Sequence, residues 1–204
     1  MGNTLTSKRI NTPVCRLAYP YIFEPDEKGK YRVVLLFDKQ NFDPNFMKEI
    51  LNEVKTLANV KYKGNIPATF RANPLKDGDV PNSTGNTPFK GYYYCNAQSN
   101  FKPGVVASYP DPEGRKKPDG TPAPMIITDA NEIYGGVYAR ANIHAYDYNF
   151  QGNSGIGISI NSIQKIKDGD RLGNGGGAAN DFDCFETNEV QAMQDLDALV
   201  DMGI

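Results

Sequence analysis

The sequence predicts a mainly β fold, an antiparallel barrel of five or six strands with one inserted α-helix. Three observations predict it. The 20 glycines and 14 prolines interrupt about one residue in six, which is typical of short strands joined by turns. Several segments have the alternating or continuous apolar pattern of strands. One segment alone has the apolar spacing of an amphipathic helix.

The first half of the chain supplies two strands and the helix. Residues Val14–Tyr19 are predicted as the first strand, and Tyr31–Phe37 as a buried central strand, because it is a nearly continuous β-branched and apolar run. Asp43 can cap a helix, and Pro44 fits its first position, since proline has no N–H to lose there. The apolar face expected to pack against the barrel consists of Phe46, Ile50, Val54 and Leu57.

The second half supplies the remaining strands. Gly91–Ser99 is a strand candidate, and Pro103–Pro124 is expected to contain a long loop with a basic tip. Gly135–Phe150 alternates strictly between apolar and polar residues over ten positions, as a strand with two distinct faces does. Gly155–Lys167 is the last strand. Its alternation of apolar and polar positions shifts by one residue before Ile163, which predicts a β-bulge. This order of elements favours an OB-type barrel.

The outer face of the Gly135–Phe150 strand carries aromatic rings beside a guanidinium, where a solvated strand would carry lysine, glutamate, threonine and serine. Its members are Tyr138, Arg140, Asn142, His144, Tyr146 and Tyr148. Single-stranded nucleic acid needs flat surfaces for base stacking, worth about 1–3 kcal/mol per base, and cations along the phosphates. For any single one of these tyrosines, half-buried packing is the better explanation. Packing does not explain the whole row, because the apolar residues on the opposite face of the strand already provide the side chains that pack in the core.

Other candidates follow the same chemistry. One set consists of residues spaced two apart, which are therefore expected on one face of a strand: Lys90, Tyr92 and Tyr94. A basic cluster in the long loop is either a phosphate clamp or a solvated surface: Arg115, Lys116 and Lys117. Weaker cationic candidates are Arg71 and Lys102.

Charge divides the chain into a basic body and an acidic tail. Residues 181–204 hold seven acids and no Lys or Arg, so the rest has 22 bases against 24 − 7 = 17 acids, a net charge of +5. Gly173–Gly177 reads as a flexible linker. We therefore expect a nucleic-acid-binding domain over residues 1–172, and a linker with an acidic tail over 173–204. An ordinary disordered terminus on a mildly basic domain is the alternative.

The tail is expected to inhibit the binding groove or to dock partner proteins. Val190, Met193, Leu196 and Leu199 recur every third residue and could form one helical stripe against a partner. The candidate tail residues are Asp181, Phe182, Asp183, Phe185, Asp195, Leu196, Asp197, Leu199 and Asp201.

No catalytic, metal or cofactor site is predicted. The three cysteines, Cys15, Cys95 and Cys184, are far apart in the sequence, and His144 is the only histidine, which excludes a zinc site and a catalytic triad. No apolar run is long enough for a signal peptide or a membrane span. The sequence therefore favours a cytoplasmic, non-enzymatic protein with reduced thiols.

The chain resembles a family of phage-encoded single-stranded DNA-binding proteins with an OB fold. The resemblance is carried by Tyr134–Ala141 (YGGVYARA) and Ser159–Gly173 (SINSIQKIKDGDRLG), and the strands at Pro13–Arg16 and Tyr31–Asp38 also fit. It implies sequence-independent binding of displaced strands during phage replication or recombination in the host cytoplasm. It also implies a tail that competes with DNA and docks replication proteins.

Two alternatives remain beside DNA binding. In one, the chain is a phage structural or assembly protein whose tyrosine-rich face is a subunit interface. In the other, which has less support, it is a metal-dependent nuclease, a class that needs clustered carboxylates in a fixed framework. The sequence leaves a homodimer open.

Overall fold

The computed structural model describes residues 4–67, 70, 74–150 and 153–172. The chain divides into two units, Met1–Leu172 and Gly173–Ile204. Every tail residue named above lies outside the described residues, and so does Arg71. The elements are β1 (Ile10–Asn11), β2 (Cys15–Tyr21), β3 (Tyr31–Asp38), α1 (Pro44–Tyr62), β4 (Lys76–Asp77), β5 (Tyr92–Ser99), β6 (Gly104–Pro110), β7 (Pro124–Ile126), β8 (Tyr138–Phe150) and β9 (Asn153–Lys167), with short 3-10 helices at Lys39–Asn41 and Ala130–Glu132.

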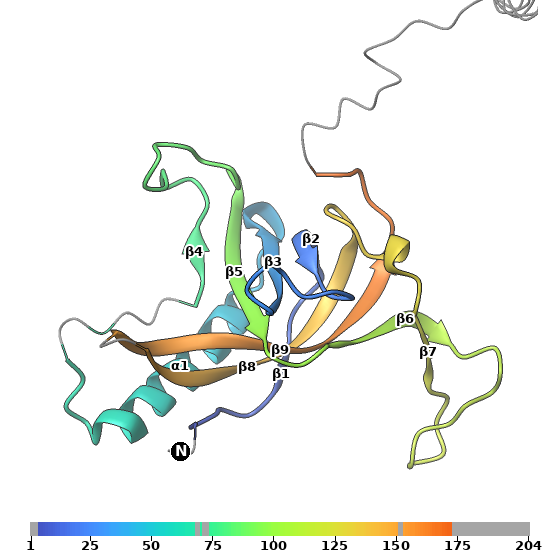
Figure 1. Cartoon of the computed structure of the whole chain (residues 1–204), viewed down its shortest axis with the longest axis horizontal. Coiled ribbons are helices and arrows are strands. Elements are labelled where there is room, and N and C mark those ends of the chain that lie inside the picture. The colour runs from blue at the N-terminus through green and yellow to red at the C-terminus, as the bar shows by residue number, and fades with distance from the viewer. Residues whose placement is uncertain (1–3, 68–69, 71–73, 151–152, 173–204) are drawn as a thin grey trace, which may run out of the picture. The chain divides into compact units, whose positions relative to one another are not determined.

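Five strands close a barrel (Figure 1). β2 pairs with β3, β3 with β5, β5 with β9, β9 with β8, and β8 returns to β2. Only the β5–β9 pair of this circuit is parallel. The predicted barrel with one inserted helix is therefore confirmed. β1 adds to β8, β4 adds to β5, and β6 and β7 extend the sheet beyond β9.

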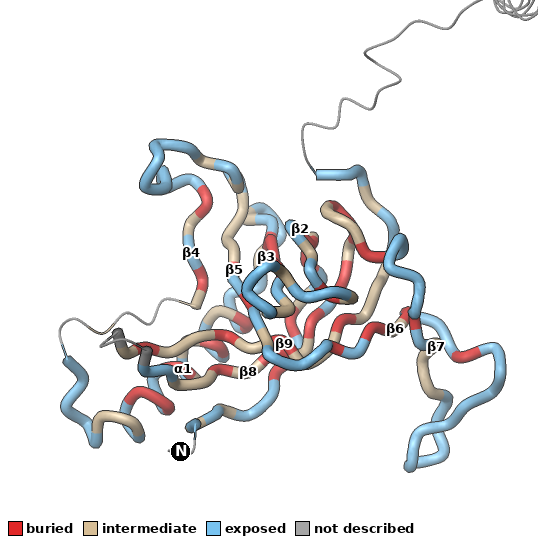
Figure 2. The backbone as a smooth tube through the Cα atoms, viewed as in Figure 1, coloured by how far each residue is buried: buried red, intermediate tan, exposed pale blue. Residues whose placement is uncertain are grey.

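The barrel interior is filled by the faces that the alternating pattern predicted (Figure 2). On β8, Ala139, Ala141, Ile143 and Ala145 are buried, while the residues between them are half-buried or exposed. The predicted bulge on β9 is also confirmed. Asn142 pairs with Ser162 and Ile143 with Ile160, which leaves Asn161 as the extra residue.

Helix α1 begins and packs as predicted. The Asp43 carboxylate accepts a hydrogen bond from the Asn45 N–H, and Pro44 occupies the first turn. The helix ends at Tyr62, and Lys63 caps it in a left-handed conformation and donates its N–H to the Asn59 carbonyl. The four predicted apolar residues are all buried, on the side where α1 contacts β8 and β9.

The long loop expected within Pro103–Pro124 is present, but strands β6 and β7 occupy the two ends of that range. β6 pairs in parallel with β9 and antiparallel with β7, so strands border a shorter projecting segment, which we call the basic arm (residues 111–123). The buried Asp111 carboxylate holds the arm by accepting from the Glu113 N–H and pairing with Arg115. The turn at the tip is closed by Gly120, whose N–H donates to the Lys117 carbonyl. Strand pairing with β9 is non-local, and no local pattern in the sequence reveals it.

Candidate nucleic-acid interface

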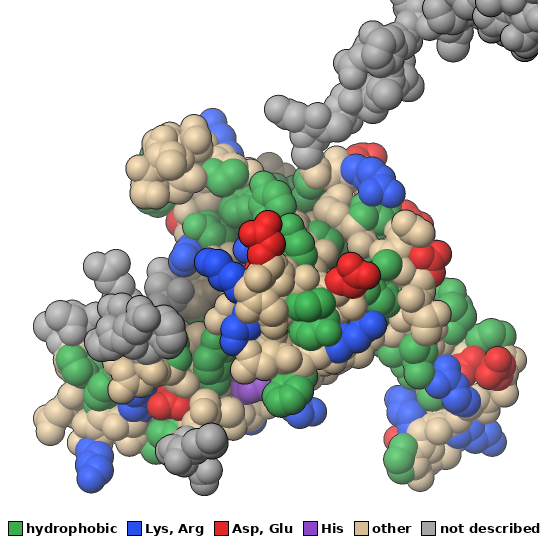
Figure 3. Space-filling view, viewed as in Figure 1, with side chains coloured by type: hydrophobic (Ala, Val, Ile, Leu, Met, Phe, Trp, Pro, Cys, Tyr) green, Lys and Arg blue, Asp and Glu red, His purple; other side chains and the backbone are tan. Residues whose placement is uncertain are grey.

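A groove of about 1230 Å³ crosses the outer face of β3 and β5. The end of β2 borders it on one side and the β8–β9 hairpin on the other. Figure 3 shows Lys and Arg side chains gathered at the lower ends of β3 and β5 and again on the basic arm. The polar and aromatic side chains that line the groove are Thr4, Tyr19, Tyr21, Lys30, Arg32, Asn96, Gln98, Asn100, Tyr146, Asp147, Tyr148 and Asn149.

Four tyrosines supply flat surfaces in the groove. Tyr19, Tyr21 and Tyr148 are 62%, 42% and 37% exposed. The Arg32 guanidinium lies 4.7 Å from the centre of the Tyr21 ring, and its Nε lies 3.0 Å from Asp26 Oδ2. The groove thus combines rings with cations, the pair of features that single-stranded nucleic acid requires.

Sequence reasoning missed Tyr19 and Tyr21. Strand periodicity places both residues on the same inward face as the fully buried Leu17. The register between β2 and β3 shifts between Ala18 and Tyr21, and Tyr19 has a left-handed φ of 47°. This conformation costs about 1–2 kcal/mol for a residue with a Cβ. The irregularity turns both rings outward, and a Tyr-Pro-Tyr sequence at the end of a strand was the only local hint of it.

Tyr146 and Tyr148 are the predicted aromatic residues that the structure brings into the groove. Tyr146 comes from β8, and its hydroxyl accepts a hydrogen bond from Gln98 Nε2 on β5 at 2.7 Å. The Lys61 ammonium donates to the Tyr148 carbonyl at 2.8 Å, which ties this end of β8 to helix α1. The walls of the groove are thereby held by contacts between distant parts of the chain.

The other members of the predicted row share the outward face of β8 but do not line the groove. Tyr138 and Tyr146 are eight residues apart, about 26 Å along an extended strand. The Tyr138 ring lies 4.7 Å from Lys167 Nζ and 5.4 Å from Arg16 Cζ. Arg140 Nε donates to the Thr12 carbonyl.

The middle of the row is also engaged within the domain. Asn142 donates to Asn11 Oδ1 at 2.8 Å and accepts from Asn161 at 3.0 Å. Burial lowers the pKa of His144, so this imidazole is neutral near pH 7. The structure thus divides the row into a groove end and a distant end.

The remaining candidates do not line the groove. Tyr92 and Tyr94 share one face of β5, as predicted, and the Tyr94 ring packs 4.9 Å from the ring of Phe89. Lys90 is exposed just before β5. Lys102 Nζ lies 5.4 Å from the ring of Phe23. On the basic arm, Arg115 is paired with Asp111, while Lys116 and Lys117 are exposed.

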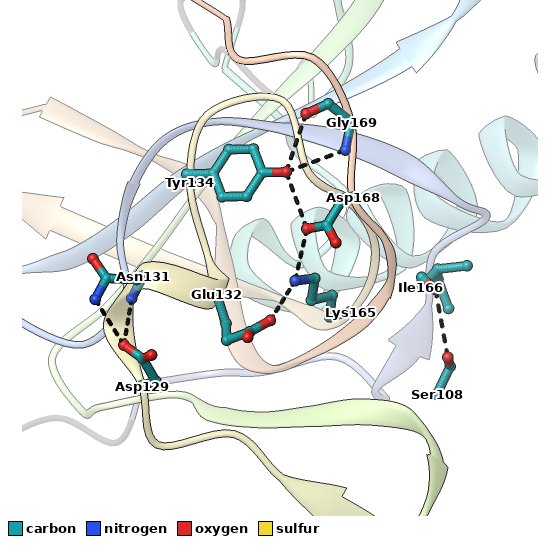
Figure 4. Close-up of polar contacts among 9 residues, drawn as sticks. All are labelled: Ser108, Asp129, Asn131, Glu132, Tyr134, Lys165, Ile166, Asp168 and Gly169. Carbon is teal, nitrogen blue, oxygen red and sulfur yellow. Dashed lines mark hydrogen bonds and ion pairs between the residues drawn. The ribbon is translucent and has the colours of Figure 1, made fainter.

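The two segments that carry the family resemblance meet at the far end of the barrel (Figure 4). We call this contact the clasp (residues 134–136 and 165–172). The Tyr134 hydroxyl lies 3.0 Å from Asp168 Oδ1, and the Lys165 ammonium lies 2.8 Å from the same oxygen. These contacts lower the pKa of Asp168 and keep it charged. The clasp therefore fixes where β9 ends, and its residues serve the fold.

Gly136 makes the clasp possible. Its φ is +116°, and a Cβ on it would lie only 2.0 Å from the Asp170 carbonyl oxygen. The neighbouring Gly135 carbonyl accepts from the Leu172 N–H at 2.7 Å. Only glycine allows the two chain segments to approach so closely.

Within residues 4–67, 70, 74–150 and 153–172, no group of three or more His, Cys, Asp or Glu side chains could hold a metal ion. No helix in the same part of the chain is long and apolar enough to cross a membrane. Cys15 and Cys95 are buried in the barrel, and burial raises the pKa of each thiol to about 12. Both are therefore poor nucleophiles.

Comparison with known proteins gives a consistent result. The family model described as the ssDNA-binding protein of Enterobacter phage Enc34 matches residues 8–196. The solved structure of the bacteriophage Enc34 protein in complex with ssDNA has a TM-score of 0.62 and 21% identity, covering 81% of this chain and 89% of that chain. For gp2.5, a single-stranded DNA-binding protein of bacteriophage T7, the TM-score is 0.56 at 16% identity, covering 87% of this chain and 96% of that chain. No curated protein matches the sequence.

Proposed function

Because this chain belongs to the family of the Enterobacter phage Enc34 single-stranded DNA-binding protein, we propose that it binds single-stranded DNA during phage replication or recombination in the host cytoplasm. The observation that carries the proposal is the groove over β3 and β5, lined by four tyrosines and two cations. β3 and β5 are the second and third strands of the closed barrel, and this is the face on which OB folds bind oligonucleotides.

In the proposed mechanism, bases stack on Tyr19, Tyr21, Tyr146 and Tyr148, while Lys30 and Arg32 contact phosphates. Every base has a π face, so stacking on tyrosine requires no particular sequence. A duplex keeps its base faces stacked inside the helix and cannot offer them to these rings. The mechanism therefore selects single strands over double strands, and it assigns the chain no catalytic step.

The basic arm is proposed as a second, outlying contact for phosphates. Lys116 and Lys117 are exposed there, and the ion pair between Arg115 and Asp111 supports the shape of the arm. Lys90 and Lys102, which lie before and after β5, are proposed for the same role. These cations would extend the path of a strand that leaves the groove, through contacts that carry no sequence information.

Titration of a fluorescently labelled oligonucleotide at several salt concentrations tests the proposal. We expect single-stranded DNA to bind, and the logarithm of the binding constant to fall with the logarithm of the salt concentration by about 0.7 per phosphate contacted. A duplex of the same sequence is the control and should bind much more weakly. Failure to bind any single strand would refute the proposal and favour a subunit interface at the tyrosine-rich face.

The acidic tail is proposed as an intramolecular competitor for the basic groove. The body carries a net charge of +5 and residues 181–204 carry seven acids, joined by a glycine-rich linker. A tethered acidic segment has a high effective concentration near any basic surface within its reach. Docking of replication proteins is the second proposed role, served by Phe182, Phe185, Leu196 and Leu199.

Deletion of residues 181–204 is expected to tighten single-strand binding at low salt, with a gain that shrinks as salt screens the competition. The measurement is the same oligonucleotide titration on the full and truncated chains. A tail in which the seven acids are replaced by Asn or Gln separates charge from length, and it should behave like the deletion. Equal affinities of the full and truncated chains across the whole salt range would contradict autoinhibition.

A further inference from the structure

Two glycines of β9 lie directly opposite the groove tyrosines of β8. In the β8–β9 ladder, Tyr146 pairs with Gly157 and Tyr148 pairs with Gly155. Glycine weakens the interior of a strand, because it has no side chain to pack and loses much conformational freedom on folding. Its presence at two alternate positions, each opposite a tyrosine, calls for a structural reason.

The tyrosine rings occupy the space that side chains at these glycines would fill. A Cβ on Gly157 would lie 2.7 Å from Tyr146 Cζ, and a Cβ on Gly155 would lie 2.5 Å from the Tyr148 hydroxyl oxygen. Both distances are shorter than real Cβ atoms show. Each ring therefore lies over the backbone of β9 instead of standing upright from β8.

The hydrogen bond of Tyr146 shows how far its ring reaches. In the barrel, β9 lies between β8 and β5. The Tyr146 hydroxyl nevertheless contacts Gln98 Nε2 on β5 at 2.7 Å. The ring reaches over β9, where Gly157 leaves room for it, and the Gln98 side chain meets its hydroxyl from β5.

We propose that Gly155 and Gly157 are positioning residues for single-stranded DNA, an inference that rests on the proposed function. They hold one face of each tyrosine ring against the sheet and leave the opposite face to stack with a base. Neighbouring positions on one strand face are about 7 Å apart. This is roughly twice the 3.4 Å rise per base of a stacked strand. Two successive bases on these rings are therefore unstacked from each other, one on each ring.

The test compares Gly157→Ala and Gly155→Ala with a matched control, Gly104→Ala. Gly104 is also a strand glycine paired with β9, but a Cβ there would approach nothing closer than Ser162 Cβ at 3.9 Å. We expect the two β9 variants to bind labelled oligonucleotide about three- to tenfold more weakly than wild type, because tilting a ring costs part of its stacking. The salt slope should not change, since no phosphate contact is lost. Gly104→Ala should bind like wild type.

A double variant distinguishes positioning from a general loss of stability. If Gly157 acts through Tyr146, then adding Gly157→Ala to Tyr146→Ala should weaken binding no further. Additive losses, or β9 variants that bind as tightly as Gly104→Ala, would overturn the inference while leaving the binding of the wild-type chain intact. A wild-type chain that does not bind would instead overturn the proposed function, and this inference with it.

A measurement on the folded wild-type chain keeps the inference testable if an alanine variant does not fold. Protons that lie over the face of an aromatic ring resonate upfield. The Hα protons of Gly155 and Gly157 should therefore be shifted upfield in the NMR spectrum, and the Gly157 shift should vanish in Tyr146→Ala. Unshifted glycine protons would contradict the flat placement of the rings.

Discussion

Tyr146→Ala is expected to weaken single-strand binding by about 1–3 kcal/mol, a factor of about 5 to 150, because it removes one stacking surface from the groove. The loss should be similar for different base sequences, since stacking does not read the base. The oligonucleotide titration that tests the proposed function measures both effects. The salt slope of the variant should match that of the wild-type chain, because the phosphate contacts remain.

Tyr138→Ala is the matched control, as it makes the same change on the same face of the same strand. The Tyr138 ring is engaged by Arg16 and Lys167, far from the groove. Its removal should leave binding nearly unchanged. Neither tyrosine variant should lose as much stability as the core truncation Leu35→Ala, which is expected to cost about 2–5 kcal/mol. Equal losses of affinity at positions 138 and 146 would show that the strand follows the whole of β8 and not the groove.

Gly136→Ala is expected to lower the free energy of unfolding by about 2–6 kcal/mol. A residue with a Cβ at the φ of +116° costs on the order of 1–3 kcal/mol. The clash with the Asp170 carbonyl oxygen adds about 1–3 kcal/mol as the clasp shifts to relieve it. Urea denaturation followed by circular dichroism measures the change. Oligonucleotide affinity of the folded fraction should be retained, because the clasp lies away from the groove.

Gly120→Ala separates the two contributions. Gly120 also has a positive φ, +82°, but a Cβ there would meet nothing within 4 Å. Gly120→Ala should therefore lower the free energy of unfolding only by the cost of a Cβ at positive φ, about 1–2 kcal/mol. If Gly136→Ala is no more destabilising than Gly120→Ala, the close approach of residues 136 and 170 does not contribute to stability.

The sequence by itself determined which residues fill the barrel and where the helix begins. Alternation over Gly135–Phe150 and the apolar run of Tyr31–Phe37 reported which side of each strand is buried, because strand side chains alternate with a period of two whatever the partner strand. Asp43 and Pro44 marked the helix start, since capping is satisfied within one turn. The shift in apolar alternation before Ile163 revealed the bulge, because alternation is also a local property of the strand. The family resemblance was likewise readable from two short segments, and the match to residues 8–196 confirms it.

The composition of the groove was decided by tertiary structure. Tyr19 and Tyr21 reach it because an irregularity in β2 reverses the face that periodicity assigns to them. Of the predicted row on β8, only Tyr146 and Tyr148 line the groove, because a strand of 13 residues extends well beyond it. Their rings lie flat because of glycines on β9, a different strand. Local periodicity records whether a side chain faces the core, but which outward side chains share a surface depends on strand pairings between segments far apart in the chain.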